Sequence, residues 1–293
     1  MKYSWIFFAG LLFFINACQK QIQPPYEAPV EPDSVYTLKR FVVVDPGLVA
    51  PTDSIYTYSY AYDNLNRCTG IISTDMYAGT FYTTTNYFNG NDTLMYKRSV
   101  VWDGTGEEAA EFFSYNGNGI MVYDSLVNTG GSNPGYISYR YSINNNRISL
   151  VTSIGNPPYK GTYILGRNGD GDLTSEVDSG FVYDLASSAY MLDVVSNHTN
   201  TYDANHCPFY KLYPLSPVIL EYENYLRDDK PMYMSLFQQH NILTETRTVV
   251  PTSSGLMTYN NAYTYHYNAD GYPTDVIIQE LATGKTYKGY YFY

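Results

Sequence analysis

The amino-acid sequence predicts a mainly β protein, in which a row of antiparallel β-hairpins forms one large curled sheet with one short helical insert. The first observation is composition: 35 of the 293 residues are tyrosine and 22 are glycine. The second is that tyrosines alternate with other residues in short runs, and a cluster of Asn, Asp and Gly follows each run. Alternation places the rings on one face of a strand, and the cluster suits the positive φ of hairpin turns.

The chain begins with a pattern that is typical of a lipoprotein signal peptide, predicted over residues 1–17. Lys2 supplies a positive charge, and residues 5–15 form an apolar core that is too short to span a bilayer as a helix. Ala17 then precedes Cys18, as in the lipobox of bacterial lipoproteins. We predict that Cys18 is lipidated and anchors the chain to a membrane through its acyl chains. The alternative is an ordinary secretory signal that is cleaved near Ala17.

The remaining chain divides into a tether and a single domain. Residues 18–34 contain four prolines and little that could form a core, so we predict a semi-extended tether. Residues 35–293 are long enough to bury a sizeable core, and we predict that they form one β-hairpin-repeat domain.

The hairpin repeat has a period of about 25 residues. One residue near the end of each strand that precedes a turn cluster serves as the reference point. For the first five strands these residues are Tyr62, Tyr87, Tyr115, Tyr141 and Leu165, and they are separated by 25, 28, 26 and 24 residues. This spacing fits one hairpin and its connection. Because an isolated hairpin is barely stable in water, we expect neighbouring hairpins to pair and to bury the tyrosine face.

The repeat is interrupted by an insert, predicted as helical or irregular, at about residues 208–240. Ser216-Pro217 has the form of a helix start, and apolar residues at helical spacing follow. We predict a short amphipathic helix here, and a structured loop is the alternative. Upstream of the insert, residues 200–205 read as another hairpin turn, so that His198 and His206 would approach each other across it.

The hairpin unit resembles the YD (RHS-like) repeats of bacterial surface and toxin proteins in a degenerate form. The whole mature chain is similar to uncharacterised Bacteroidetes lipoproteins that are built from such hairpins. Residues 265–273 (YHYNADGYP) carry the resemblance most clearly, followed by 202–210 and 241–244. The sequence departs from the pattern at 206–208, where the resemblance would place an Asn-Pro pair. The resemblance implies a fold and an envelope location, and it implies neither an activity nor catalytic residues.

One turn cluster also resembles the start of a calcium-binding loop. Asn168, Asp170 and Asp172 place oxygen-bearing side chains at alternate positions, and such oxygens are the ligands that calcium prefers. However, Leu173 and Ser179 stand where an EF-hand has glycine and glutamate. The alternative is that the segment is simply one more hairpin turn, and we otherwise predict no cofactor.

The cysteines and histidines show no metal or redox motif. Cys68 and Cys207 lie just past the turns of distant hairpins, so we expect free, half-buried thiols, and a disulfide would require the row of hairpins to curl until its ends meet. His266 alternates with the tyrosines on either side of it, and we expect it on the opposite, exposed face.

Charge and motifs exclude several functions. The net charge of −11 and the scattered basic residues argue against binding of nucleic acid. No serine-nucleophile elbow and no facing pair of catalytic carboxylates can be recognised, so we predict that the chain is not an enzyme.

The sequence favours a lipid-anchored envelope protein that binds a glycan, peptide or protein ligand through its tyrosine-rich β surface. The alternatives are a structural scaffold or spacer and, less favoured, an enzyme acting on envelope polymers. The segment after Cys18 contains no acidic residue before Glu27, which favours the periplasmic face of the outer membrane over the cell surface.

Overall fold

The structure is a computed structural model. It describes residues 37–44, 54–75, 80–102, 108–119, 121–128, 135–144, 147–154, 159–210, 238–251 and 255–293. Contacts divide the chain into Met1–Ser34 and Val35–Tyr293, and only the second unit contains described residues. The predicted signal peptide, tether and helix therefore lie outside the described residues.

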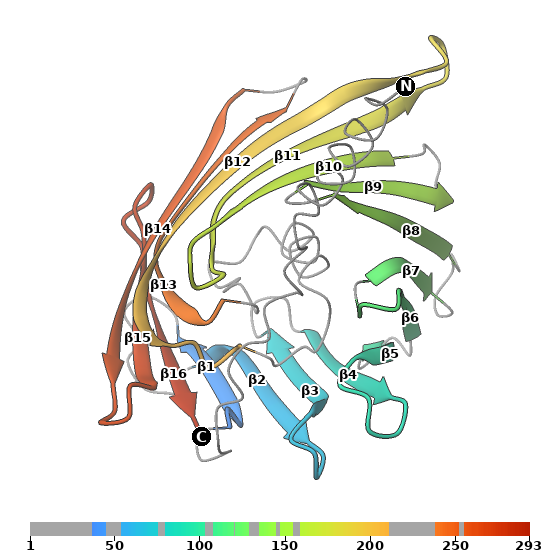
Figure 1. Cartoon of the computed structure of the whole chain (residues 1–293). Coiled ribbons are helices and arrows are strands. Elements are labelled where there is room, and N and C mark those ends of the chain that lie inside the picture. Colours follow the sequence, from blue (N-terminus) through green and yellow to red (C-terminus); the bar gives the residue numbers. More distant parts are fainter. Residues whose placement is uncertain are drawn as a thin grey trace, which may run out of the picture. The chain divides into compact units, whose positions relative to one another are not determined.

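The described residues form sixteen antiparallel strands that close into a barrel, each pairing with its neighbours in sequence order (Figure 1). The strands are β1 Arg40–Val44, β2 Ser54–Tyr62, β3 Cys68–Asp75, β4 Thr80–Phe88, β5 Met95–Trp102, β6 Glu108–Tyr115, β7 Met121–Asn128, β8 Gly135–Asn144, β9 Arg147–Ile154, β10 Tyr159–Arg167, β11 Leu173–Asp184, β12 Ala189–His206, β13 His240–Pro251, β14 Met257–Tyr267, β15 Pro273–Glu280 and β16 Thr286–Phe292. This arrangement confirms the predicted mainly β class and the row of hairpins. No helix within the described ranges is long and apolar enough to cross a membrane.

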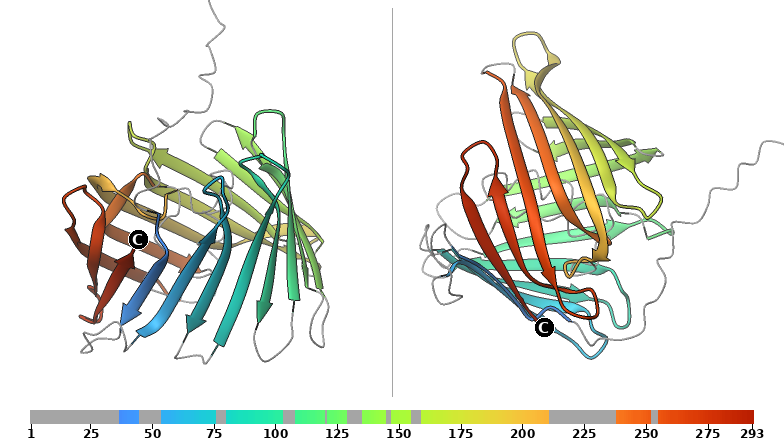
Figure 2. Two further views of the ribbon diagram at one scale, coloured as in Figure 1. Left: turned by 90° about the horizontal axis from the view of Figure 1, so that it is seen from below. Right: turned by 90° about the vertical axis from the view of Figure 1, so that its left-hand side faces the viewer.

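The barrel closes where the first strand pairs with the last. β1 pairs with β16 from Arg40 opposite Phe292 to Val44 opposite Lys288, and β1 also pairs with β2 on its other edge. The two views of Figure 2 show the blue and red strands next to each other. The sequence predicted a curled sheet, and pairing of its first and last described strands closes that sheet into a barrel.

Three turns on one rim of the barrel share the same hydrogen bonds from side chain to backbone. In the β2–β3, β10–β11 and β14–β15 turns, the Oδ1 atom of the first turn residue accepts hydrogen bonds from the backbone N–H groups two and four residues later; these first residues are Asp63, Asn168 and Asn268. The fourth turn residue has a positive φ, which explains the glycines at 171 (φ 92°) and 271 (φ 79°). A bulge follows each of these turns, with Thr69, Thr174 or Thr274 as the extra residue. The Asn, Asp and Gly clusters of the sequence are thus local turn-forming units.

Tyrosines at the ends of strands connect neighbouring hairpins on this rim. The hydroxyl of each tyrosine donates a hydrogen bond of 2.5–3.0 Å to a backbone carbonyl within two residues of the start of an adjacent strand. The pairs are Tyr62 to Leu38, Tyr115 to Met95, Tyr202 to Leu173 and Tyr293 to Pro273. Between β4 and β3 the amide of Asn86 donates to the Cys68 carbonyl in the same way. At Tyr62 and Tyr115 the tyrosine before the turn therefore stabilises the junction between neighbouring hairpins.

We predict that Tyr115→Phe lowers the free energy of unfolding by about 0.5–1.5 kcal/mol, because the Met95 carbonyl loses its hydrogen-bond donor while the ring is kept. Chemical denaturation monitored by tyrosine fluorescence would measure the change. Tyr87→Phe is the control, since it removes a hydroxyl from a side chain on the outer face of the barrel that is 38% exposed. Equal stability of the two variants would contradict the proposed role of the strand-end tyrosines.

The two faces of the wall differ in composition. The inner face of β14, β15, β16, β1 and β2 carries tyrosines and aliphatic side chains, which pack into one core cluster that includes Phe41, Tyr263, Tyr265, Val276 and Tyr291. The outer face of β12 and β13 carries exposed threonine and asparagine side chains, for example Asn197, Thr199 and Thr246. The outer face of other strands also exposes apolar side chains, among them Ile72, Phe112, Val122, Ile164 and Val177. His266 lies on this outer face with its side chain 61% exposed, as predicted.

One expected hairpin turn is absent. Residues 200–205 do not reverse the chain; they belong to β12, which continues to His206 through a bulge opposite Asn241. The Oδ1 atom of Asp203 accepts hydrogen bonds from the backbone N–H groups of Asn205 and Asn241, which stabilises the bulge. His198 and His206 therefore lie on one strand and do not face each other across a hairpin. The antiparallel strand that pairs with this part of β12 is β13.

Candidate functional site

A group of buried and half-buried polar side chains lies on the inner face of three adjacent strands. This inner polar cluster consists of Glu176 and Asp178 on β11, Ser196, His198 and Asn200 on β12, and Glu245 and Arg247 on β13. The register aligns Glu176, His198 and Arg247 across the three strands, with Asp178 opposite Ser196 and Asn200 opposite Glu245. Period-2 alternation thus brings seven polar residues onto one face.

Burial changes the protonation of this cluster. Burial raises the pKa of Asp178 to about 6, against the opposing effects of the Arg247 charge and the hydrogen bond to Ser196. Burial and the Arg247 charge together lower the pKa of His198 to about 3, so its imidazole is neutral at pH 7. A neutral imidazole offers one N–H donor and one acceptor nitrogen.

Glu245 is a second carboxyl whose environment opposes ionisation. Burial raises its pKa, although hydrogen bonds act in the other direction: the Tyr263 hydroxyl donates to Oε2 at 2.9 Å, and the Asn261 amide donates to the same oxygen at 3.3 Å. These bonds fix the orientation of Glu245 on the inner face and connect the inner polar cluster to the tyrosines of β14.

Two buried atoms of the cluster have no hydrogen-bond partner within the described part of the chain. They are Nε2 of His198 and Oδ1 of Asn200, two residues apart on the inner face of β12. The amide of Asn200 is itself held, because it donates to the Leu173 carbonyl at 3.2 Å. Buried polar atoms are normally paired, so these two call for a partner in the form of water or a ligand.

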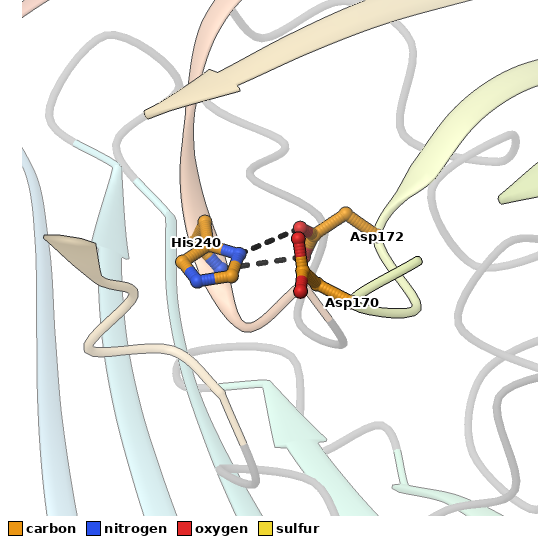
Figure 3. A group of neighbouring side chains, drawn as sticks. All are labelled: Asp170, Asp172 and His240. Atoms are coloured by element: carbon orange, nitrogen blue, oxygen red, sulfur yellow. Dashed lines mark hydrogen bonds and ion pairs between the residues drawn. The ribbon is translucent and has the colours of Figure 1, made fainter. Parts of the chain in front are cut away.

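A second group lies on the rim, where the β10–β11 turn meets the start of β13. Asp170, Asp172 and His240 place one ligand-type atom each within 4.8 Å of the others (Figure 3). Asp172 is buried and Asp170 is exposed. The Oδ2 atom of Asp172 lies 2.7 Å from Nδ1 of His240, and its Oδ1 atom accepts from the Gln239 N–H at 2.8 Å.

Of the three residues predicted for calcium, the structure brings two into this rim group. Asp170 and Asp172 belong to it, whereas the Oδ1 atom of Asn168 accepts hydrogen bonds from the backbone N–H groups of those two residues inside the turn. The amide of Asn168 donates to Asp172. Asn168 therefore orients Asp172. No local pattern indicated that His240, 68 residues further on, would complete the group.

The two cysteines are free thiols, as expected, and both are buried. Closure of the barrel brings Cys68 and Cys207 into the same core cluster. Burial raises the pKa of each thiol to about 12, so neither is a reactive thiolate at neutral pH. Cys18, the predicted lipidation site, lies outside the described residues.

Together, the fold and the inner face define a closed antiparallel barrel with a tyrosine-rich and polar interior. No protein-family model and no curated protein matches the chain. Among solved structures it is similar to a porin-like protein from Bacteroides vulgatus, with 9% identity, a TM-score of 0.47, and coverage of 87% of this chain and 98% of the other. It is also similar to a porin-like protein from Bacteroides uniformis, with 12% identity, a TM-score of 0.45, and coverage of 88% and 96%.

Proposed function

We propose that this chain is a lipid-anchored binding protein of the bacterial envelope that holds a hydroxyl-rich ligand, such as a glycan, against the inner face of its barrel. The observation that carries the proposal is the pair of buried, unpartnered atoms on β12, Nε2 of His198 and Oδ1 of Asn200. Hydroxyl groups donate and accept hydrogen bonds, so a polyhydroxylated ligand can satisfy both atoms.

The surroundings of these atoms support the same ligand class. The neighbouring strands contribute tyrosines on the same face, such as Tyr163 opposite Asp178 and Tyr263 bonded to Glu245, and both of these side chains are buried. Tyrosine offers a flat apolar ring and a hydroxyl at low cost in conformational entropy, which suits the alternating apolar and polar faces of a sugar. The tyrosine-rich surface predicted from the sequence is therefore proposed as the ligand-binding face, on the inside of the wall.

The polar outer face of β12, β13 and β14 supports a wall that stands in water at these strands, whereas other strands expose single apolar side chains such as Ile72 and Val177. Across β12, β13 and β14 the register places Thr199 opposite Thr246, and Thr246 opposite Asn260. In a transmembrane barrel, the wall that faces lipid carries a continuous apolar band about 25 Å tall. We therefore propose that the membrane is reached through acyl chains on Cys18, as the sequence predicts, and that the strands remain outside the bilayer.

A glycan-array screen of the full chain in mild detergent tests the proposed ligand, with His198→Ala as the site variant. We expect a glycan that binds the unchanged protein to bind His198→Ala about five- to tenfold more weakly, because the loss of one buried hydrogen bond costs about 1–1.5 kcal/mol. His266→Ala is the matched control, since this histidine lies on the outer face. Equal affinity of the two variants, or no binding by the unchanged protein, would contradict the proposal and favour the scaffold alternative.

We further propose that the hairpins are degenerate YD-like repeats of a Bacteroidetes lipoprotein and that the protein faces the periplasm. The strand-end tyrosines Tyr62 and Tyr115 and the Asn or Asp that opens the turn support the first point. Protease treatment of intact cells tests the second. Protection until the outer membrane is breached is the expected result, and cleavage on intact cells would place the protein on the cell surface.

A further inference from the structure

We propose that Asp170, Asp172 and His240 form a binding site for a divalent transition-metal ion of the zinc class. The three side chains converge from two segments that are far apart in sequence, the β10–β11 turn and the first residue of β13 (Figure 3). This site lies on the rim, and the inference does not depend on the ligand proposed for the inner face.

The ligand atoms lie within reach of a single small ion once Nδ1 of His240 and Oδ2 of Asp172 no longer bond to each other. Nδ1 of His240 and Oδ2 of Asp172 are 2.7 Å apart, and the ligand atom of Asp170 lies within 4.8 Å of both. Ligand atoms that bind one zinc ion at about 2.0–2.2 Å lie roughly 3–4 Å from one another. Binding of one ion therefore requires the hydrogen bond between His240 and Asp172 to open and the exposed Asp170 side chain to move towards them.

The surrounding hydrogen bonds hold the central ligand in place. Asp172 is fully buried, and it accepts hydrogen bonds from the amide of Asn168 at 3.1 Å and from the N–H of Gln239 at 2.8 Å. Hydrogen bonds of this kind orient the direct ligands of metal sites and contribute to metal affinity. Asp172 is therefore preorganised before a metal arrives.

A comparison of two turns shows that the second carboxylate is not needed to form the turn. The β14–β15 turn has the same backbone and Asn hydrogen bonds, with Asn268 and Asp270 in the places of Asn168 and Asp170. Tyr272 stands there in the place of Asp172. Within the described residues, only the β10–β11 turn combines two carboxylates with a histidine.

The ligand set selects the class of metal. Calcium takes six to eight oxygen ligands, whereas imidazole suits zinc and other transition metals. Two carboxylates and one imidazole are three protein ligands, which leaves at least one position for water or for a further donor. The assignment therefore differs from the calcium loop that the sequence suggested.

Titration calorimetry of zinc chloride into the full chain, purified in detergent and freed of metal with a chelator, tests the site. We expect one zinc ion per chain, at least about tenfold weaker binding by Asp170→Asn and His240→Gln, and weaker binding of calcium than of zinc. Asp270→Asn is the matched control in the equivalent turn and is expected to bind zinc as the unchanged protein does.

Thermal unfolding of the same variants separates metal binding from folding. We expect zinc to raise the Tm of the unchanged protein and of Asp270→Asn but not that of Asp170→Asn, with equal Tm values for all three without metal. The inference is overturned if the unchanged protein binds no zinc at millimolar concentration, if Asp170→Asn binds it equally well, or if calcium binds more tightly than zinc.

Discussion

Substitution of Gly289 by alanine is expected to lower the free energy of unfolding by about 1–3 kcal/mol, the range measured when a packed core receives an extra group. Gly289 lies on β16 opposite Val43, where the last strand pairs with the first. A Cβ atom at this position would lie 2.8 Å from Cζ of Phe41 and 2.8 Å from Cγ1 of Val276, closer than side-chain carbons normally approach. Phe41 has little room to move, because it packs against Phe209 and Tyr291.

The control for this prediction is Gly70→Ala on β3. There a Cβ atom would meet the Cβ atom of Ala61 at 3.5 Å, an ordinary contact, so the variant is expected to be as stable as the unchanged protein or slightly more stable. Chemical denaturation of both variants measures the difference. If Gly289→Ala unfolded at the same denaturant concentration as Gly70→Ala, close packing at the closing strand pair would not be required.

Substitution of Asp172 by alanine is expected to cost about 2–4 kcal/mol of unfolding free energy even in metal-free buffer. Its carboxylate accepts hydrogen bonds from the backbone N–H groups of Gln239 and His240 and from the side chain of Asn168, and it contacts the ring of His240. Removal leaves several buried donors without a partner, and each unsatisfied group costs about 1–3 kcal/mol.

Asp170→Ala is the matched control, because it removes a carboxylate of the same turn that is exposed to solvent. Without metal we expect its stability to stay within about 0.5 kcal/mol of the unchanged protein. Hydrogen exchange of the Gln239 and His240 amides would localise the effect, since both should exchange faster in Asp172→Ala. Unchanged stability of this variant would show that the turn and the start of β13 are held together by other contacts.

Local features of the fold were predictable because the responsible interactions are local. The Asn and Asp side chains that open the turns bond to backbone groups two and four residues away, and tyrosine alternation follows from the pleat of a single strand. The hairpins at Tyr62, Tyr115 and Leu165 accordingly appear where the sequence placed them.

The remaining features depend on contacts between distant segments. β12 continues past Tyr202 because Asp203 bonds to Asn241, 38 residues away, and no local signal distinguishes this bulge from a turn. Closure rests on pairing of Arg40–Val44 with residues near the C-terminus. The sequence shows that Glu176 and Asp178 lie on the same face of their strand, because they are two residues apart. That His198 shares this face follows only from the register between β11 and β12.

Thiol labelling of a Thr246→Cys variant in native membranes tests the central claim, that the outer wall meets water and the tyrosine-rich face lies inside. Thr246 is exposed near the middle of β13, and the two described native thiols are buried, with their pKa raised to about 12, so their background labelling should be low. We predict fast reaction with a water-soluble, membrane-impermeant maleimide once the outer membrane is permeabilised. Reaction with only a lipid-soluble maleimide would show that this wall faces lipid, and it would contradict the account.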